Sequence, residues 1–379
     1  MSRPFTVLSI ILAAFCIQVS AMGAPTAESF GTTKDGHPVE IYTLTNDTGM
    51  TAKVMTRGAT LVELHVPDKD GNMNDVILGF DDVSGYESEG NQYFGCTTGR
   101  VCNRIDSGRF TLDDKNYTLA KNDGDKHHLH GGGENSLDKV VWNAKAFDSE
   151  KVTGLIFTYT SPDGEEGYPG NLSIRVIYLL VKAQNLLRID YEATTDQRTP
   201  INLTNHMYLN LEGAGSPTVL DHKLQINADQ YTVANEELIP TGEIAEVSGT
   251  PLDFRQSTRI GDRIEQLTDT GAKGYDHNYV LNVNRQDRPQ HFVATLTAPT
   301  SGRLLTIHST EPGVQLYSGN FLMGQTGKDG KVYPHRSAIC LETQHYPDSV
   351  NHDDFPSTIL NPGETFVSQT TYRFTTDEN

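Results

Sequence analysis

Residues 201–211 have the sequence Ile-Asn-Leu-Thr-Asn-His-Met-Tyr-Leu-Asn-Leu, in which apolar and polar side chains alternate. This two-residue period predicts a β-strand with one face in a hydrophobic core. The opposite face contains no Lys, Arg, Asp or Glu, which fits a polar cleft for a neutral, hydroxyl-rich ligand. His206 on that face can transfer a proton near neutral pH, although a purely structural histidine is the alternative. The polar face comprises Asn202, Thr204, His206, Tyr208 and Asn210.

Strand-like runs recur along most of the chain and are separated by turn residues. Asp-Gly pairs mark four of these turns, and helical periodicity is scarce, with residues 260–267 as the best short candidate. We therefore predict an all-β protein, a large antiparallel β-sandwich with very little helix, and keep a two-domain division as the alternative. The strand-like runs are residues 52–66, 155–160, 172–181, 186–193, 292–298 and 304–309.

The N-terminus has the pattern of a secretory signal peptide. Arg3 provides a positive start, and residues 7–19 form an apolar run too short to span a bilayer. Ala21 ends a small-residue cleavage site, and Gly23 ends a second candidate site. We expect residues 1–21 to be the signal peptide and residues 22–379 to form a single domain. The mature protein would then be secreted or periplasmic, without a membrane anchor.

Charge and cysteine content exclude several classes of protein. The 30 basic and 49 acidic side chains give a formal charge of −19, so nucleic acids and anionic membranes are poor partners. Of the 4 cysteines, Cys16 lies in the predicted signal peptide, which leaves an odd number and argues against a disulfide scaffold. A disulfide bridge between Cys96 and Cys102 is an alternative to two free thiols. The sequence is compatible with a monomer or a homodimer.

The segment Thr-Gly-Arg-Val-Cys-Asn-Arg-Ile at residues 98–105 contains candidate ligand-binding side chains. Arg100 and Arg104 carry planar, directional donors suited to sugar hydroxyls, and Asn103 lies beside the second arginine. The pattern is weak by itself because arginines are common on the surfaces of β-sandwiches. It supports a binding site only in combination with further motifs.

A second segment contains His127, His128 and His130, followed by three glycines. Three histidines so close together suggest a metal site. No cysteine or carboxylate stands at a recurring ligand spacing, however, and strand geometry would point His128 and His130 to one side and His127 to the other. We therefore predict no metal and keep a metalloprotein as an alternative. The glycines allow a backbone to pass close to a ligand.

Three strand-like segments in the C-terminal half add polar side chains. Asp276, in Tyr-Asp-His-Asn-Tyr, could accept hydrogen bonds from two neighbouring sugar hydroxyls or cap a turn. Gln315 alternates with apolar neighbours. Glu342 shares a strand face with Cys340, and partial burial would raise the pKa of Glu342 towards the range useful for a general base. A surface carboxylate on an edge strand is the alternative for Glu342.

Together these segments resemble those of the aldose 1-epimerases, also called galactose mutarotases, in the same order and over residues 30–375. Each segment is a weak signal alone, whereas their combination over one domain-sized chain is a strong one. The resemblance implies a large β-sandwich of the galactose-mutarotase type with an open cleft on one sheet. The resembling segments are residues 99–100, 103–105, 129–132, 202–206, 276–278, 313–315, 319–321, 341–344 and 346–348.

The resemblance also implies roles for individual residues. Glu342 corresponds to the general base and His206 to the general acid, and we expect them to face each other across a groove one pyranose wide. His130 corresponds to the second active-site histidine. Cys102, where many relatives have alanine, and the predicted secretion signal depart from the family pattern. The positions that correspond to sugar contacts are Asn103, Arg104, Asp276 and Gln315.

The implied activity is the interconversion of the α and β anomers of a free aldose such as glucose or galactose. Ring opening removes a proton from the C1 hydroxyl and delivers one to the ring oxygen, so an ionised Glu342 and a protonated His206 would suffice. No metal, nucleotide or redox cofactor is then needed. A glycosidase that uses Glu342 with Asp276 and a non-catalytic sugar-binding module are the alternatives. Binding of a hexose phosphate would require more basic residues near these motifs than the sequence contains.

Overall fold

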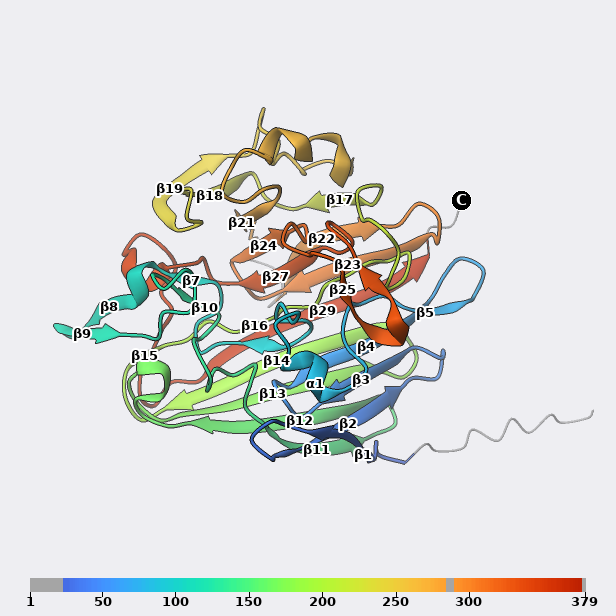
Figure 1. Cartoon of the computed structure of the whole chain (residues 1–379), viewed down its shortest axis with the longest axis horizontal. Coiled ribbons are helices and arrows are strands. Elements are labelled where there is room, and N and C mark those ends of the chain that lie inside the picture. The colour runs from blue at the N-terminus through green and yellow to red at the C-terminus, as the bar shows by residue number, and fades with distance from the viewer. Residues whose placement is uncertain (1–22, 284–289, 377–379) are drawn as a thin grey trace, which may run out of the picture.

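The computed structural model describes residues 23–283 and 290–376 (Figure 1). The signal peptide expected at residues 1–21 lies outside the described residues, so it stays a prediction. Within the described part of the chain, none of the helices has the length and apolar character needed to cross a membrane.

The largest sheet has nine strands, each antiparallel to its neighbours. Its long central strands are among those expected from the sequence, and residues 172–181 form one of them over the expected length. Their side chains alternate because the pleat of a strand places successive residues on opposite faces. In spatial order the strands are β11 (Asn143–Asp148), β12 (Val152–Ser161), β13 (Leu172–Val181), β14 (Leu186–Thr195), β29 (Phe366–Thr376), β23 (Arg303–Ser309), β22 (His291–Thr297), β17 (Lys223–Ile226) and β20 (Thr258–Arg259).

Two five-stranded antiparallel sheets accompany the large sheet. The first, in spatial order, consists of β1 (Ala27–Thr32), β2 (Pro38–Thr45), β3 (Thr51–Met55), β4 (Thr60–Pro67) and β5 (Met73–Asp75). The second consists of β19 (Pro240–Glu246), β18 (Gln230–Ala234), β21 (Asp276–Val280), β24 (Gly313–Tyr317) and β27 (Cys340–Gln344). The run expected as one strand at residues 52–66 is divided into β3 and β4, because Gly58 and Ala59 have left-handed backbone angles that turn the chain.

The remaining elements are short. Within the described residues, α1 (Val83–Tyr86) is the one α-helix, and the carboxylate of Asp82 caps its first turn. The helical candidate at residues 260–267 forms two 3-10 turns instead. The short strands are β6 (Thr97–Thr98), β7 (Arg104–Ile105), β8 (Arg109–Leu112), β9 (Lys115–Thr118), β10 (His128–Leu129), β15 (Thr199–Pro200), β16 (Thr204–Asn205), β25 (Gln325–Thr326), β26 (Val332–Tyr333) and β28 (Ile359–Leu360). The 3-10 helices are η1 (Asp106–Gly108), η2 (Glu165–Gly167), η3 (Ile260–Asp262), η4 (Ile264–Leu267), η5 (Lys328–Gly330) and η6 (Ser349–Asn351).

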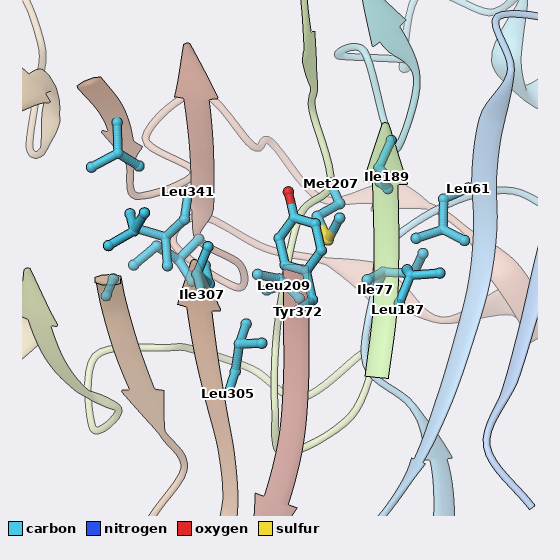
Figure 2. Packing of buried hydrophobic residues seen from close by; sticks show 14 of the residues in the cluster. Leu61, Ile77, Leu187, Ile189, Met207, Leu209, Leu305, Ile307, Leu341 and Tyr372 are labelled. Atoms are coloured by element: carbon cyan, nitrogen blue, oxygen red, sulfur yellow. The ribbon is translucent and has the colours of Figure 1, made fainter. Parts of the chain in front are cut away.

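One hydrophobic cluster joins the three sheets. Leu61 comes from β4, Leu187 from β14 and Leu341 from β27, so the nine-stranded sheet packs against both five-stranded sheets. Figure 2 shows Met207 and Leu209 from the connecting segment in the same core. Each fully buried leucine stabilises this packing by about 1.5–3 kcal/mol relative to an exposed one. The predicted antiparallel β-sandwich with very little helix is confirmed.

Residues 201–211 do not form the half-exposed strand that their alternation predicts. Thr204–Asn205, which is β16, pairs with β6, but the rest of the segment is irregular. Every residue of the segment is buried, and Leu209 bridges both Ile77 and Ile339. The second face is therefore largely covered by protein instead of being open to a ligand.

Two polar side chains of this segment are structural, contrary to their expected place in a cleft. The side-chain amide of Asn202 donates to the main-chain oxygen of His345 and its oxygen accepts from the same residue's N–H, at 3.1 and 3.0 Å. Asn210 donates to the main-chain oxygen of Ser337 at 2.8 Å. These bonds satisfy buried main-chain groups where segments from distant parts of the chain cross.

Candidate active site

One face of β21, β24 and β27 carries polar side chains next to one another. Strand pairing places Gln315 beside Glu342 and Asp276 beside Tyr317. The other face of these strands buries Leu341 and its neighbours in the core. Because alternate residues of a strand point to opposite faces, anchoring Leu341 in the core turns Glu342 away from it.

A cleft of about 230 Å³ opens at this face. This volume is smaller than the roughly 300–1,000 Å³ of typical drug-sized ligand sites and suits a ligand of the size of one sugar ring. All of the site residues predicted from the sequence, except Gln315, line it. The lining residues are Asn91, Gln92, Tyr93, Asn103, Arg104, Leu129, His130, His206, Tyr208, Asp276, Tyr317, Phe321 and Glu342.

Glu342 and His206 form a pair of buried side chains, and Glu342 is the less exposed of the two. Its Oε1 is 3.7 Å from Nε2 of His206, and its Oε2 is buried without a hydrogen-bond partner among the described residues. Burial raises the pKa of Glu342 well above its usual value; the nearby Asp276 adds to this shift and Arg104 opposes it. A buried, unpaired acceptor is costly, so a ligand hydroxyl that donates to Oε2 would be favoured there.

The 3.7 Å separation corrects one expectation. Glu342 and His206 do not face each other across a gap one pyranose wide, because two side chains so close together leave no room for a ring between them. They lie side by side on the wall of the cleft. Such a pair can contact two neighbouring atoms of one ligand.

The position of His206 is set by its main chain. Its N–H donates to the main-chain oxygen of Cys96 at 2.9 Å, and its carbonyl accepts from the N–H of Gly95 at 3.0 Å. The imidazole directs Nε2 towards Glu342, and its Nδ1 lies 3.6 Å from Sγ of Cys340. The ring therefore has a distinct neighbour at each nitrogen.

Protonated His206, expected from the sequence on the condition that cleft carboxylates stabilise it, is not the favoured form in the empty cleft. Burial lowers the pKa of His206 to about 4. The protonated ring loses its hydration, and a backbone hydrogen bond offsets only part of that loss. Burial also raises the pKa of Glu342 in the same pocket, so the empty cleft favours the neutral forms of both groups, with the proton of the pair on the carboxyl group.

His130 acts as a hydrogen-bond donor towards the cleft. Its Nδ1 accepts the main-chain N–H of Asn103 at 3.1 Å, and burial holds the pKa of His130 well below its usual value, so the ring is neutral. A neutral imidazole that accepts at Nδ1 carries its proton on Nε2. The ladder between β7 and β10, in which Leu129 pairs with Arg104, keeps this loop in register.

The three neighbouring histidines do not converge. His128 is held between the main-chain oxygen of Ala120 and the hydroxyl of Tyr168, and His127 accepts the main-chain N–H of Ser107. His130 alone of the three lines the cleft. The expectation that His128 and His130 point to the same side is wrong, because β10 ends at Leu129 and the positive φ of His130, 50°, breaks the strand alternation.

His130, His206 and Glu342 place one possible ligand atom each within 4.8 Å of one another, a spacing compatible with a metal ion. The tautomer of His130 argues against that use. A metal requires a lone pair on the coordinating nitrogen, whereas the contact with Asn103 leaves the proton of neutral His130 on Nε2. The donor set suits a hydroxyl-bearing ligand better than a cation.

The two arginines considered together in the sequence have separate roles. Arg104 lines the cleft, where its Nε donates to Asp123 at 2.7 Å. Arg100 is 2% exposed and turns away from the cleft, donating to Ser161 and to the main-chain oxygen of Pro169. Arg100 is therefore a structural residue, and Arg104 is the arginine available to a ligand.

Gln315 lies behind the cleft wall instead of in it. It is 4% exposed, and its Nε2 donates to Oδ1 of Asp276 at 2.6 Å. Burial raises the pKa of Asp276, while Arg104 and this hydrogen bond lower it. Gln315 therefore orients Asp276 and favours its charged form.

Sequence patterns predicted no role for the aromatic side chains of the cleft, although they placed Tyr208 on the polar face of residues 201–211. The ring centroid of Tyr93 lies 4.5 Å from that of His130 and 5.9 Å from that of His206. The ring of Tyr208 stacks on His206 with a centroid distance of 5.1 Å. Tyr208 shares the polar face of residues 201–211, so the alternation contained a signal for it. Tyr93 lies in an irregular segment, where no periodicity could reveal it.

Comparison with known proteins gives a consistent picture. The family described as aldose 1-epimerase matches residues 40–373. The chain is 43% identical to the galactose mutarotase of Bos taurus over 337 residues, covering 89% of this chain and 94% of that protein. It is 36% identical to the aldose 1-epimerase of Escherichia coli K12, covering 90% of this chain and 96% of that protein. The solved structure of galactose 1-epimerase from Lactobacillus acidophilus has a TM-score of 0.80 and 30% identity, covering 94% of this chain and 100% of that one.

Proposed function

Because this chain belongs to the aldose 1-epimerase family, we propose that its cleft interconverts the α and β anomers of free hexoses such as glucose and galactose, with Glu342 as general base and His206 as general acid. The protein is an epimerase that acts on carbohydrates. The observation that carries the assignment is the buried pair itself, with Nε2 and Oε1 3.7 Å apart and Oε2 unpartnered among the described residues.

The spacing of the pair matches the two atoms that must exchange protons. Ring opening removes the proton from O1 and adds one to O5, and both oxygens are bonded to C1. Neighbouring catalytic groups on one wall can therefore reach both atoms at once. Positioned acid and base groups each typically contribute about 10²–10⁴-fold to the rate.

The proton count of the pair is the one that the reaction needs. Neutral Glu342 with neutral His206 and ionised Glu342 with protonated His206 contain the same number of protons, and one transfer between Oε1 and Nε2 interconverts them. A sugar hydroxyl that donates to Oε2 stabilises the carboxylate and so favours the reactive form.

The steps then follow. Glu342 takes the O1 proton while Nε2 of His206 gives its proton to O5, the C1–O5 bond breaks and a C1 carbonyl forms. Rotation about C1–C2 presents the other face of the carbonyl to O5. Re-addition of O5 returns its proton to His206, and Glu342 returns the first proton to O1. Each group ends in its starting state.

Neighbouring donors and acceptors supply stabilisation and orientation. Nε2–H of His130 and the guanidinium of Arg104 would donate to the oxygen that gains negative charge as the carbonyl forms or reacts. Asp276 and Asn103 would hold the other hydroxyls, and Gln315 would act through Asp276. Groups already fixed by protein hydrogen bonds lose little freedom when the sugar binds.

We propose a location outside the cytoplasm for the mature protein, on the basis of the sequence pattern in residues 1–21. Mass spectrometry of the protein isolated from its native source would give the mature N-terminus. A chain that begins after Ala21 or Gly23 supports export, and an intact Met1 contradicts it.

The direct test is polarimetry with freshly dissolved α-glucose, α-galactose and other free aldoses. We expect the purified protein to accelerate the approach to anomeric equilibrium without changing the final rotation. Binding of sugar without acceleration would support a sugar-binding module instead. Release of reducing ends from oligosaccharides would support a glycosidase.

A further inference from the structure

Cys340 lies in contact with the ring of His206, on the side opposite to Glu342. Its Sγ is 3.6 Å from Nδ1, and both residues are buried. We propose that Cys340 is a positioning residue, whose sulfur accepts the Nδ1–H of His206 and so reserves Nε2 for the mobile proton. This inference rests on the acid role of His206 proposed above.

The strand β27 connects the two sides of the ring. Cys340 and Glu342 are two residues apart on one face of this strand, so the pleat holds both side chains at a fixed spacing. His206 comes from a separate segment, and its main chain is tied to Cys96 and Gly95. One strand therefore presents the base to Nε2 and a sulfur to Nδ1.

The catalytic cycle requires one tautomer. After Nε2 of His206 has given its proton to O5, the neutral ring keeps a single proton. If that proton is on Nδ1, Nε2 has a free lone pair and can take the proton back when the ring recloses. If it is on Nε2, reclosure has no acceptor at O5. A hydrogen-bond acceptor at Nδ1 selects the productive tautomer, as a buried carboxylate does for the histidine of serine proteases.

A thiol suits this position better than a carboxylate would. Burial raises the pKa of Cys340 well above its usual value, and Glu342 and Asp276 add to the shift, so the group stays uncharged. A charged acceptor would stabilise the imidazolium and make His206 a weaker acid. A weak, neutral acceptor orients the ring and leaves its proton easy to release.

The thiol could also act in the opposite sense. If S–H donated to Nδ1, the neutral ring would carry its proton on Nε2, and the carboxyl group of Glu342 could not donate to that nitrogen. The two arrangements predict opposite tautomers for the same atoms, so a direct measurement of the tautomer decides between them.

The first experiment compares three variants by polarimetric kinetics. Cys340→Ala removes the acceptor and should lower kcat by about tenfold, the lower end of the effect of removing the hydrogen-bond partner of a metal-bound histidine, with KM changed less than about twofold. Cys340→Ser restores an acceptor and should recover most of kcat. Cys102→Ala is the control, because the Cys102 thiol is equally buried but donates to Gln344 instead of contacting the ring.

The results separate the inference from the function on which it rests. A wild-type protein that does not accelerate mutarotation refutes the function. An active wild type whose Cys340→Ala variant keeps its kcat, or loses no more than Cys102→Ala, refutes the positioning role alone. A Cys340→Ser variant as slow as Cys340→Ala also refutes it, because the lost acceptor would then not be the cause.

The second experiment does not depend on the folding of any Cys340 variant. Long-range ¹H–¹⁵N correlation of wild-type protein labelled at histidine nitrogens reports which nitrogen of His206 is protonated, with assignment by the signals missing from His206→Asn. We expect a protonated Nδ1 and an unprotonated Nε2 in the free enzyme near neutral pH. The reverse assignment overturns the proposal.

Discussion

Oε1 of Glu342 and Nε2 of His206 lie 3.7 Å apart on one wall of a buried cleft. The residues come from β27 and from a segment that crosses between the sheets, and each is at most 6% exposed at its side chain. Desolvation therefore controls both: it raises the pKa of Glu342 and lowers that of His206. The pair's chemistry follows from this shared environment.

The first prediction concerns the two proposed catalytic groups. Glu342→Gln and His206→Asn should each lower kcat by at least about 10²-fold, because each removes one proton-transfer group while keeping similar volume. Polarimetry with α-galactose measures the rate, and circular dichroism verifies the fold. Glu192→Gln, on β14 and paired with Arg175 away from the cleft, is the matched control and should retain activity. Normal turnover by Glu342→Gln would refute the base assignment.

The second prediction is a plateau in the pH dependence of kcat/KM. Activity should fall as the pH drops towards about 4, where His206 becomes protonated while Glu342 still holds its proton. It should fall again as the pH rises through the raised pKa of Glu342, because the pair then loses its single proton. Rates corrected for spontaneous mutarotation give the profile. An acidic limb at the ordinary histidine pKa would contradict the burial argument.

The third prediction concerns stability. The pKa of Glu342 is raised in the folded protein, so its contribution to stability is present below the unfolded pKa and is lost as the pH rises through the folded value. Glu342→Gln removes that loss, and the variant should be more stable than the wild type at pH 8 but not at pH 4. Thermal unfolding at the two pH values measures the difference. An equal effect at both would mean that Glu342 is not strongly desolvated.

The fourth prediction separates Asp276 from Gln315. Asp276→Ala should raise KM and lower kcat, because it removes a side chain that lines the cleft. Gln315→Leu should raise KM by about tenfold, which is less than the effect of Asp276→Ala. It deletes one hydrogen bond to a charged group and leaves Asp276 in place. It should also shift Asp276 towards its neutral form, so the KM penalty should shrink at higher pH. Equal effects from both changes would place Gln315 in direct contact with the sugar.

The fifth prediction distinguishes the two arginines. Arg104→Lys should lower the rate with little change in thermal stability, because a single ammonium group replaces the guanidinium fork and cannot contact both Asp123 and the ligand. Arg100→Lys should lower the free energy of unfolding by about 1–3 kcal/mol, because it leaves buried acceptors such as the oxygen of Pro169 unpaired. Denaturant titration and polarimetry on both variants test the division. A catalytic defect in a fully stable Arg100→Lys would contradict it.

Local alternation was sufficient to predict the long strands of the nine-stranded sheet and the orientation of the strand that carries Glu342. The pleat is a property of the backbone, so the sequence around Leu341 and Glu342 already indicates that one faces the core and the other does not. The same reasoning gives the antiparallel all-β class, since strand-like runs are joined by tight turns. The resemblance to a family supplied the roles, because its motifs occur in order along the chain.

Properties that depend on what covers a side chain came only from the tertiary structure. Residues 201–211 alternate like a surface strand but are buried throughout, and Arg100 and Arg104 point to different parts of the protein. The pKa shifts of Glu342 and His206, the tautomer of His130 and the sulfur beside His206 follow from burial and from contacts between distant segments. A one-dimensional pattern encodes which way a residue points relative to its neighbours, whereas desolvation and hydrogen-bond partners depend on the segments that fold against it.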